Sequence, residues 1–248
     1  MKKNVLLMSV CCCVCLIVVC ACENDKEEKK GIGDHVEVEN PYNSVGEEHN
    51  IWLDSVTLHV NNYEEQHNVD LSYNIPLLIN ICSDYMYSKG FDTLGANKNT
   101  NNVLTNISNA YRHIIDTLNL HTSTKSELYR ILNFVMEKQV DNKGVDAMLA
   151  VIKDEERRIL NNQYSIPDDE KIVVLKATST LKASLSYWDA TQMASKEKST
   201  VVAIADAIGA LGGHTMSVLA SKAAEKRLKN SINVTISGSI NNGFAVRY

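Results

Sequence analysis

Acidic and histidine side chains lie together at the start of the first predicted helix, in Glu47, Glu48 and His49. Such groups act as metal ligands or as general acids and bases when their spacing brings them together. The chain contains neither His-x-x-x-His nor His-Glu-x-x-His, and His49 and His59 would point about 80° apart on one helix. We therefore expect solvated histidines here, as at the isolated positions His35, His67, His113 and His121.

Other motifs that carry chemistry do not occur in the sequence. It has no Gly-x-Ser-x-Gly elbow, no phosphate-binding loop and no dinucleotide fingerprint. The paired carboxylates Asp168-Asp169 and Glu155-Glu156 are typical of a helix start and of a solvated helix face. We assign no catalytic, cofactor-binding or metal-ligating residue, although catalytic groups can converge from distant positions.

The N-terminus has the layout of a secretory signal. Lys2 and Lys3 precede an apolar run from Val5 to Ala21, and charged sequence follows. The ending Val19-Cys20-Ala21-Cys22 resembles the lipobox of bacterial lipoprotein precursors. The resemblance implies cleavage before Cys22, acylation of Cys22, and attachment to the membrane through that lipid. An uncleaved membrane anchor and an ordinary secretory signal cut after Ala21 are the alternatives.

The residues after the signal predict a tether and a location. Residues 22–40 are charged and glycine-punctuated, which is typical of a flexible linker. Their cluster Lys26-Glu27-Glu28 resembles surface-export tags of some outer-membrane lipoproteins, and a plain solvated tether explains it equally well. We expect a protein anchored in the bacterial cell envelope, at the outer membrane. The resemblance of the acidic cluster to surface-export tags further implies exposure on the cell surface.

The net charge limits the possible binding partners, and the cysteine content limits the possible disulfides. The formal net charge is −5, and removal of Lys2 and Lys3 leaves −7, which argues against nucleic acid as a partner. After cleavage and acylation only Cys82 keeps a free thiol, so no intramolecular disulfide can form. Cys82 lies in an apolar run, and we expect it to be buried and inert.

Hydrophobic spacing predicts a mainly α protein: a bundle of about six to seven helices over residues 41–230, followed by a small β-hairpin over 231–248. Capping boxes are predicted at Ser44-Val45-Gly46-Glu47 and Thr124-Lys125-Ser126-Glu127. The hairpin is predicted from alternating residues around Asn242-Gly243. The expected helices begin at Ser44 and Thr124 and cover about 74–89, 103–118, 145–159, 168–194 and 201–224.

The segment Val201–Ala224 is apolar and repeats small residues every four positions. On one helix these would form a continuous ridge that lets another backbone approach closely. Three interpretations are open: a buried central helix, a membrane-inserting segment, and a ligand or metal site that uses Asp206 and His214. Charges inside the segment oppose membrane insertion, at roughly 2.5–3.5 kcal/mol each. The ridge residues are Ala205, Gly209, Gly213, Ser217 and Ser221.

The sequence thus predicts an envelope lipoprotein that serves as a non-enzymatic binding or structural module for an unknown protein or small molecule. No cofactor is expected. The first alternative is a membrane-active or self-associating protein that acts through residues 201–224. The second alternative is an envelope hydrolase with no recognisable motif.

Overall fold

The computed structural model describes residues 39–93, 112, 114–140, 143–191, 196–229, 235–237 and 245–247. This part of the chain is mainly α-helical, which confirms the predicted fold class. The signal peptide, Cys22, most of the tether, His35, His113, the loop from Gly95 to Asn102 and most of the predicted helix 103–118 lie outside the described residues. The helices are α2 (Asn43–His67), the 3-10 helix η1 (Leu71–Tyr73), α3 (Ile75–Ser88), α6 (Thr122–Val140), α7 (Val145–Leu160), α8 (Asp168–Ala190), α9 (Lys196–Leu211) and α10 (His214–Lys229).

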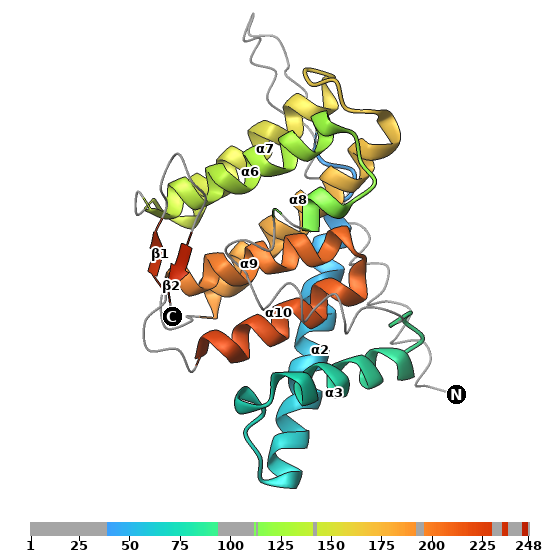
Figure 1. The fold of residues 1–248 in the computed structure, drawn as a ribbon, viewed down its shortest axis with the longest axis vertical. Coiled ribbons are helices and arrows are strands. Elements are labelled where there is room, and N and C mark those ends of the chain that lie inside the picture. Colours follow the sequence, from blue (N-terminus) through green and yellow to red (C-terminus); the bar gives the residue numbers. More distant parts are fainter. Residues whose placement is uncertain are drawn as a thin grey trace, which may run out of the picture. The chain divides into compact units, whose positions relative to one another are not determined.

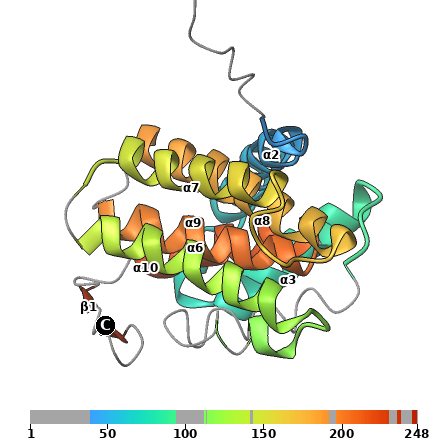
Figure 2. The same ribbon diagram turned by 90° about the horizontal axis from the view of Figure 1, so that it is seen from above.

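Helices α9 and α10 lie side by side at the centre of this arrangement, as Figures 1 and 2 show. α9 packs against α8 and α6, whereas α10 packs against α2 and α3. α8 in turn contacts α2 and α7, and α6 packs along α7. The two central helices are therefore covered by α2, α3, α6 and α8, which all precede them in the sequence.

The predicted helix over 201–224 is two helices. α9 ends at Leu211, and Gly213 has a φ of +107°, a left-handed conformation that glycine adopts without strain. The chain then reverses into α10, so the small residues do not form one ridge on one helix. The predicted burial is confirmed, because residues 198–209 and 215–224 are all buried.

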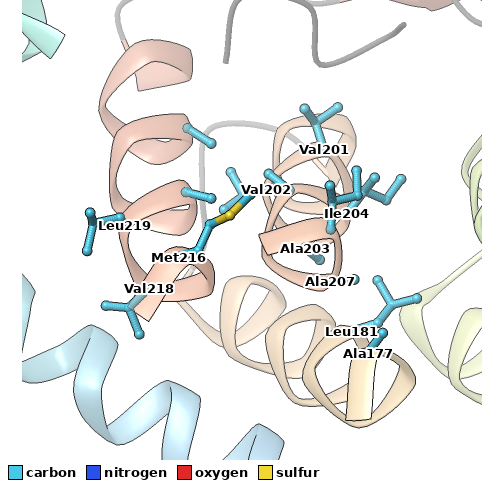
Figure 3. Close-up of a cluster of buried hydrophobic side chains, with 14 of the residues drawn as sticks. Ala177, Leu181, Val201, Val202, Ala203, Ile204, Ala207, Met216, Val218 and Leu219 are labelled. Carbon is cyan, nitrogen blue, oxygen red and sulfur yellow. The ribbon is translucent and has the colours of Figure 1, made fainter. Parts of the chain in front are cut away.

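The core between these helices is made of small and branched side chains. Figure 3 shows Met216 of α10 beside Val202 of α9, and Ala207 of α9 beside Leu181 of α8. All four side chains are buried. Alanines and glycines allow the helix axes to approach closely, and the larger side chains fill the remaining space.

The buried stripe of α2 has the regular three-four spacing of a core-facing helix. Its members are Gly46, His49, Leu53, Val56 and Val60. The helix runs as far as His67, where Asn68 takes a left-handed φ of 50° and ends it. Trp52 lies at the edge of this stripe and packs edge-to-face on Phe91 with ring centroids 4.6 Å apart.

Both predicted capping boxes are wrong. Tyr42 is the N-cap of α2 and makes no side-chain capping bond, and Ser44 lies inside the helix. Thr124 also lies inside its helix, where its hydroxyl bonds Glu170 instead of a backbone N–H. In both places the helix begins before the predicted capping residue, at Asn43 and at Thr122. The predicted start of a helix at about residue 168 is confirmed, since α8 begins at Asp168.

Two three-residue strands, β1 (Thr235–Ser237) and β2 (Ala245–Arg247), pair antiparallel with Ile236 opposite Val246. This register differs from that of a two-residue turn at Asn242-Gly243, in which Ala245 would pair with Ile240. The hairpin over 231–248 as a whole therefore stays a prediction. Among the described helices, none has both the length and the apolar character needed to cross a bilayer.

Candidate functional site

A cluster of polar side chains lies inside the apolar contact between α2, α8, α9 and α10. Asp206 is at its centre, and its Oδ2 atom accepts hydrogen bonds from the Ser184 hydroxyl and from Trp188 Nε1 at 3.2 Å. The imidazole Nε2 of His49 is 3.5 Å from the same oxygen. The Ser217 hydroxyl is 3.0 Å from His49 Nδ1 and donates to the Asp206 carbonyl at 2.7 Å. We call these five residues the Asp206 cluster.

The local sequence explains how each member reaches the centre. His49 occupies one position of the buried stripe of α2, between Gly46 and Leu53. Asp206 lies in the apolar stretch from Val201 to Leu211 of α9, a helix that packs against α6, α8 and α10. Gly209 lets the backbone of α10 approach α9, which brings the Ser217 hydroxyl within hydrogen-bonding distance of α9. The sequence of α9 and α10 therefore places a carboxylate where only other protein groups can form hydrogen bonds with it.

The Asp206 cluster is closed to solvent. Asp206 and His49 are 0% exposed and Ser217 is 1% exposed. An ionised carboxylate in such a place costs several kcal/mol unless hydrogen bonds and an opposite charge compensate it. Ser184 and Trp188 supply hydrogen bonds to this carboxylate, and the His49 imidazole lies 3.5 Å from it.

His214 lies next to the cluster, at the start of α10. Its ring meets that of His49 edge-on with centroids 6.5 Å apart, and it stacks on Phe91 at 5.5 Å. Burial lowers the pKa of His214. The negative charge of Glu48 opposes this effect, and a smaller effect of His49 adds to it. His214 is therefore neutral at pH 7.

Asp206 and His214, which one interpretation of the sequence joined in a ligand or metal site, both lie near His49. His49 itself was expected to be solvated, and this expectation is wrong. The regular spacing of Gly46, His49 and Leu53 is the signal that could have revealed it, because His49 falls on the apolar stripe. The other described histidines are more exposed: His59 stacks on Tyr85, His67 stacks on Tyr63, and His121 pairs with Glu170.

Three buried atoms in and beside the cluster are of the types that bind metal ions. His49 Nε2, Asp206 Oδ1 and His214 Nε2 are each buried without a hydrogen-bond partner. Within the residues that the structure describes, however, no three histidine, cysteine or carboxylate groups are placed to hold a metal ion. The interpretation of Asp206 and His214 as metal ligands is therefore not supported by their geometry.

Ser217, His49 and Asp206 share the connectivity of a hydrolase triad, in which a serine contacts a histidine that contacts an aspartate. A nucleophile must also be reached by its substrate. The Ser217 hydroxyl donates to a backbone carbonyl, and its Cα packs against Gly209. In this arrangement the three groups hold α2, α9 and α10 together, and no substrate carbonyl can approach the serine.

A second polar cluster joins α6 to α7. Arg130 binds Glu127 and Glu155 and donates to the Tyr164 hydroxyl at 2.6 Å. We predicted Glu155 to be on a solvated face of α7, and this is wrong because it is only 3% exposed. Burial raises the pKa of Glu127. Burial has the same effect on Glu155, but hydrogen bonds from Arg130 and Tyr164 outweigh it and hold the pKa of Glu155 below its ordinary value.

Glu156, the neighbour of Glu155, is also buried and belongs to a third cluster at the start of the described chain. Its carboxylate accepts from Asn40 at 2.6 Å, from Thr178 at 2.7 Å and from Lys182 at 2.6 Å. Asn40 donates in addition to the Leu175 carbonyl at 2.8 Å. These bonds fix the segment before α2 to α7 and α8, at the point where the predicted tether would end.

The paired carboxylates at the start of α8 behave as predicted. Asp168 and Asp169 are in the first turn of the helix, where negative charge interacts favourably with the helix dipole. Asp168 is exposed and pairs with Lys171 at 2.5 Å. These two residues therefore contribute to the helix start and bring no further group toward a site.

Cys82 is buried in α3, as predicted. Burial raises the pKa of its thiol to about 12, although the positive charges of Lys222 and Lys226 partly oppose this. A thiol with such a pKa is not ionised at neutral pH and is a poor nucleophile.

An apolar cavity of about 10 Å³ lies between α6, α8 and α9. This volume is that of roughly one water molecule, and the lining offers no polar surface. The cavity is therefore far smaller than a metabolite. Its lining includes Leu128, Leu132, Ala177, Leu181, Ala207 and Leu211.

Comparison of the chain with protein-family models, with curated proteins and with solved structures gave no match.

Proposed function

We propose that the chain is an exported lipoprotein, held at the bacterial cell envelope through acylated Cys22, and that its helical domain is a non-enzymatic binding or structural module. The closed Asp206 cluster carries the second part of this proposal. Its groups have the chemical types of a catalytic site, yet they bind one another inside the core. These contacts join α2, α9 and α10.

The other reactive groups of the described chain support the same conclusion. The thiol of Cys82 is buried and un-ionised at neutral pH. The carboxylates of Glu155 and Glu156 are each bound by a cation and by further donors. Groups that are fully engaged in this way stabilise a fold and are not free to act on a substrate.

The anchor is tested by the mass of the N-terminal peptide of the protein purified from membranes of a bacterial host. The expected peptide begins at Cys22 and carries acyl chains. Cys22→Ala should abolish acylation and membrane retention. Cys20→Ala is the matched control, since this residue leaves with the signal, and it should change neither. A mature N-terminus without lipid would overturn the anchor.

The module is tested by cross-linking the intact protein in its own envelope, followed by identification of what is attached. A reproducible partner that is lost when the helical domain is deleted but the anchor is kept supports the proposal. Turnover of an ester, amide or glycoside by the purified protein that disappears in Ser217→Ala would instead support the hydrolase alternative.

Membrane action through residues 201–224 remains the first alternative, and the structure defines what it would require. The two helices α9 and α10 would have to leave the cover of α2, α3, α6 and α8. The purified protein is added to vesicles loaded with a fluorescent dye. Dye leakage that depends on protein concentration would favour this alternative, and its absence would favour the binding module.

We also propose that residues 231–248 form the small β-hairpin predicted from the sequence. The alternation of Val234, Ile236 and Ile240 with small polar residues supports it. The antiparallel pairing of Ile236 with Val246 is compatible with such a hairpin. Backbone hydrogen exchange of these strands in the intact protein would test it.

A further inference from the structure

The starts of α6 and α8 meet at one buried carboxylate, that of Glu170. The backbone N–H of His121, the residue before α6, donates to both carboxylate oxygens at 3.1 Å. The His121 ring nitrogen Nδ1 lies 2.8 Å from Oε1, and the Thr124 hydroxyl donates to Oε2. Glu170 is in the first turn of α8 and is only 7% exposed. One side chain of α8 therefore accepts hydrogen bonds from the residues that begin α6.

Glu170 does from another helix what the glutamate of a capping box does from its own. In a capping box, the third helical residue accepts a hydrogen bond from the backbone N–H of the capping residue. The third residue of α6 is Thr124, and its side chain binds Glu170 instead. The dipoles of α6 and α8 both favour a negative charge at their starts. Burial acts to raise the pKa of Glu170, but hydrogen bonds from Thr124 and His121 outweigh it and hold this pKa below its ordinary value.

Away from Glu170, the packing of α6 on α8 and α9 is incomplete. α6 packs on these two helices less extensively than they pack on each other. The apolar cavity of about 10 Å³ lies between Leu128 and Leu132 of α6 and Ala207 and Leu211 of α9. Side chains that border a cavity lose contacts on that side. Polar contacts therefore contribute a larger share of the attachment of α6.

Several of these polar contacts lie farther along the helix. Arg130 binds a carboxylate of α7, and Gln139 accepts a hydrogen bond from Thr200 of α9 at 2.6 Å. Near the start of α6, Ser123 donates to the Ser165 carbonyl at 2.7 Å, but this bond is exposed to water. A hydrogen bond in water is weaker than one inside the protein. The first two turns of α6 therefore depend on Glu170 more than the rest of the helix does.

We infer that Glu170 is a latch that holds the first two turns of α6, residues 122–128, closed over α8 and α9. Release of the latch opens this segment while the other helices stay folded. Leu128 then leaves the edge of the cavity, and apolar side chains of α8 and α9 become exposed. Because the latch involves only groups of the helical domain, Glu170 acts in this way with or without the lipid anchor.

Amide hydrogen exchange of the intact protein tests the latch directly. The backbone N–H of His121 lies outside the helix and is bound by Glu170, so it should exchange more slowly than an unbonded amide. Residues 125–128 should exchange through a local opening, at least about tenfold faster than residues 201–208 of α9 after correction for intrinsic rates. Equal protection of the two segments would overturn the inference, because α6 would then open only together with α9.

Glu170→Gln keeps the shape of the side chain but replaces one accepting oxygen by a donor. Exchange at His121 and at residues 125–128 should rise about tenfold or more, because hydrogen bonds to a charged group are the stronger ones. Asp169→Asn is the matched control, since it removes an exposed charge from the same turn of α8 and should leave these rates unchanged. An unchanged rate in α6, or an equal rise in α6 and α9, contradicts the latch. If Glu170→Gln does not fold, the protection pattern of the unmodified protein decides.

The dye anilinonaphthalene sulfonate, which fluoresces on exposed apolar surface, gives a second readout. Glu170→Gln should bind more dye at pH 7 than Asp169→Asn and the unmodified protein do, because the opened segment exposes the lining of the cavity. Equal dye binding by the three proteins would mean that the start of α6 covers no apolar surface. That result would overturn the closure over α8 and α9.

Discussion

The Cα atom of Ser217 in α10 lies against Gly209 in α9, so close that a Cβ on residue 209 would be 2.6 Å from it. Real Cβ atoms do not approach a backbone atom to this distance. The absence of a side chain at position 209 therefore sets the separation of the two central helices. It also places the Ser217 hydroxyl next to the Asp206 carbonyl.

Gly209→Ala should destabilise the protein by about 2–3 kcal/mol, because the new methyl group forces the backbones of α9 and α10 apart. Chemical denaturation of the intact protein measures the loss. Gly144→Ala is the matched control, since a Cβ at position 144 meets no atom within 4 Å. Its effect should stay below about 1 kcal/mol. Equal losses in both variants would mean that the close approach does not limit the packing.

The sequence predicted this close packing but placed all the small residues on a single helix. Small residues at Gly209 and Ser217 indicate a close helix contact in either arrangement. What could not be predicted is that the chain reverses at Gly213. A glycine tolerates a helical and a left-handed conformation about equally, so its presence alone does not reveal which one tertiary packing selects.

Arg130→Met should destabilise the protein by about 3–5 kcal/mol, because it removes the cation that binds the buried carboxylates of Glu127 and Glu155 and leaves only Arg158, 3.7 Å from Glu155. Arg157→Met removes an arginine whose pair with Asp154 is exposed, and its cost should be below about 1 kcal/mol. Thermal unfolding at pH 7 compares the two. Similar melting temperatures would show that the α6–α7 contact does not depend on this cation.

The loss in Arg130→Met should shrink at acid pH. In the unmodified protein the hydrogen bonds from Arg130 and Tyr164 outweigh burial and lower the pKa of Glu155. Stability from this carboxylate is therefore present above the pKa of a free glutamate, about 4.3, and is lost as pH falls below it. Unfolding of Arg130→Met and of the unmodified protein should thus converge between pH 5 and pH 3.

The buried carboxylates show where sequence patterns fail. The run from Asp154 to Arg158 contains five consecutive charged residues, and such a run usually faces water. Glu155 and Glu156 of this run instead pair with Arg130 and Lys182, which belong to other helices. Partners so distant in sequence leave no periodic signal. His49 was missed for a related reason, because polar type was given more weight than its place on the apolar stripe.

Cys82 should react with a maleimide at least about a hundredfold more slowly in the native protein than in the unfolded protein. Its thiol is buried, and burial raises its pKa to about 12, so neither access nor ionisation favours attack. The control is the same protein in denaturant, where the thiol reacts at the rate of a free cysteine. Fast labelling without denaturant would show that α3 opens readily, or that the thiol is reachable.

His214 should make the protein sensitive to acid. Its folded pKa is lowered, chiefly by burial, although Glu48 opposes the shift, so the native state binds fewer protons here than the unfolded chain does. Stability from neutral His214 is present above the unfolded pKa of about 6.5 and is lost as pH falls through the folded value. His214→Gln should lose less stability between pH 7 and pH 5 than the unmodified protein, whereas His67→Gln should behave as the unmodified protein does. If His214→Gln kept the full acid sensitivity, the loss would have to come from other groups, and the neutral state assigned to His214 beside His49 would be wrong.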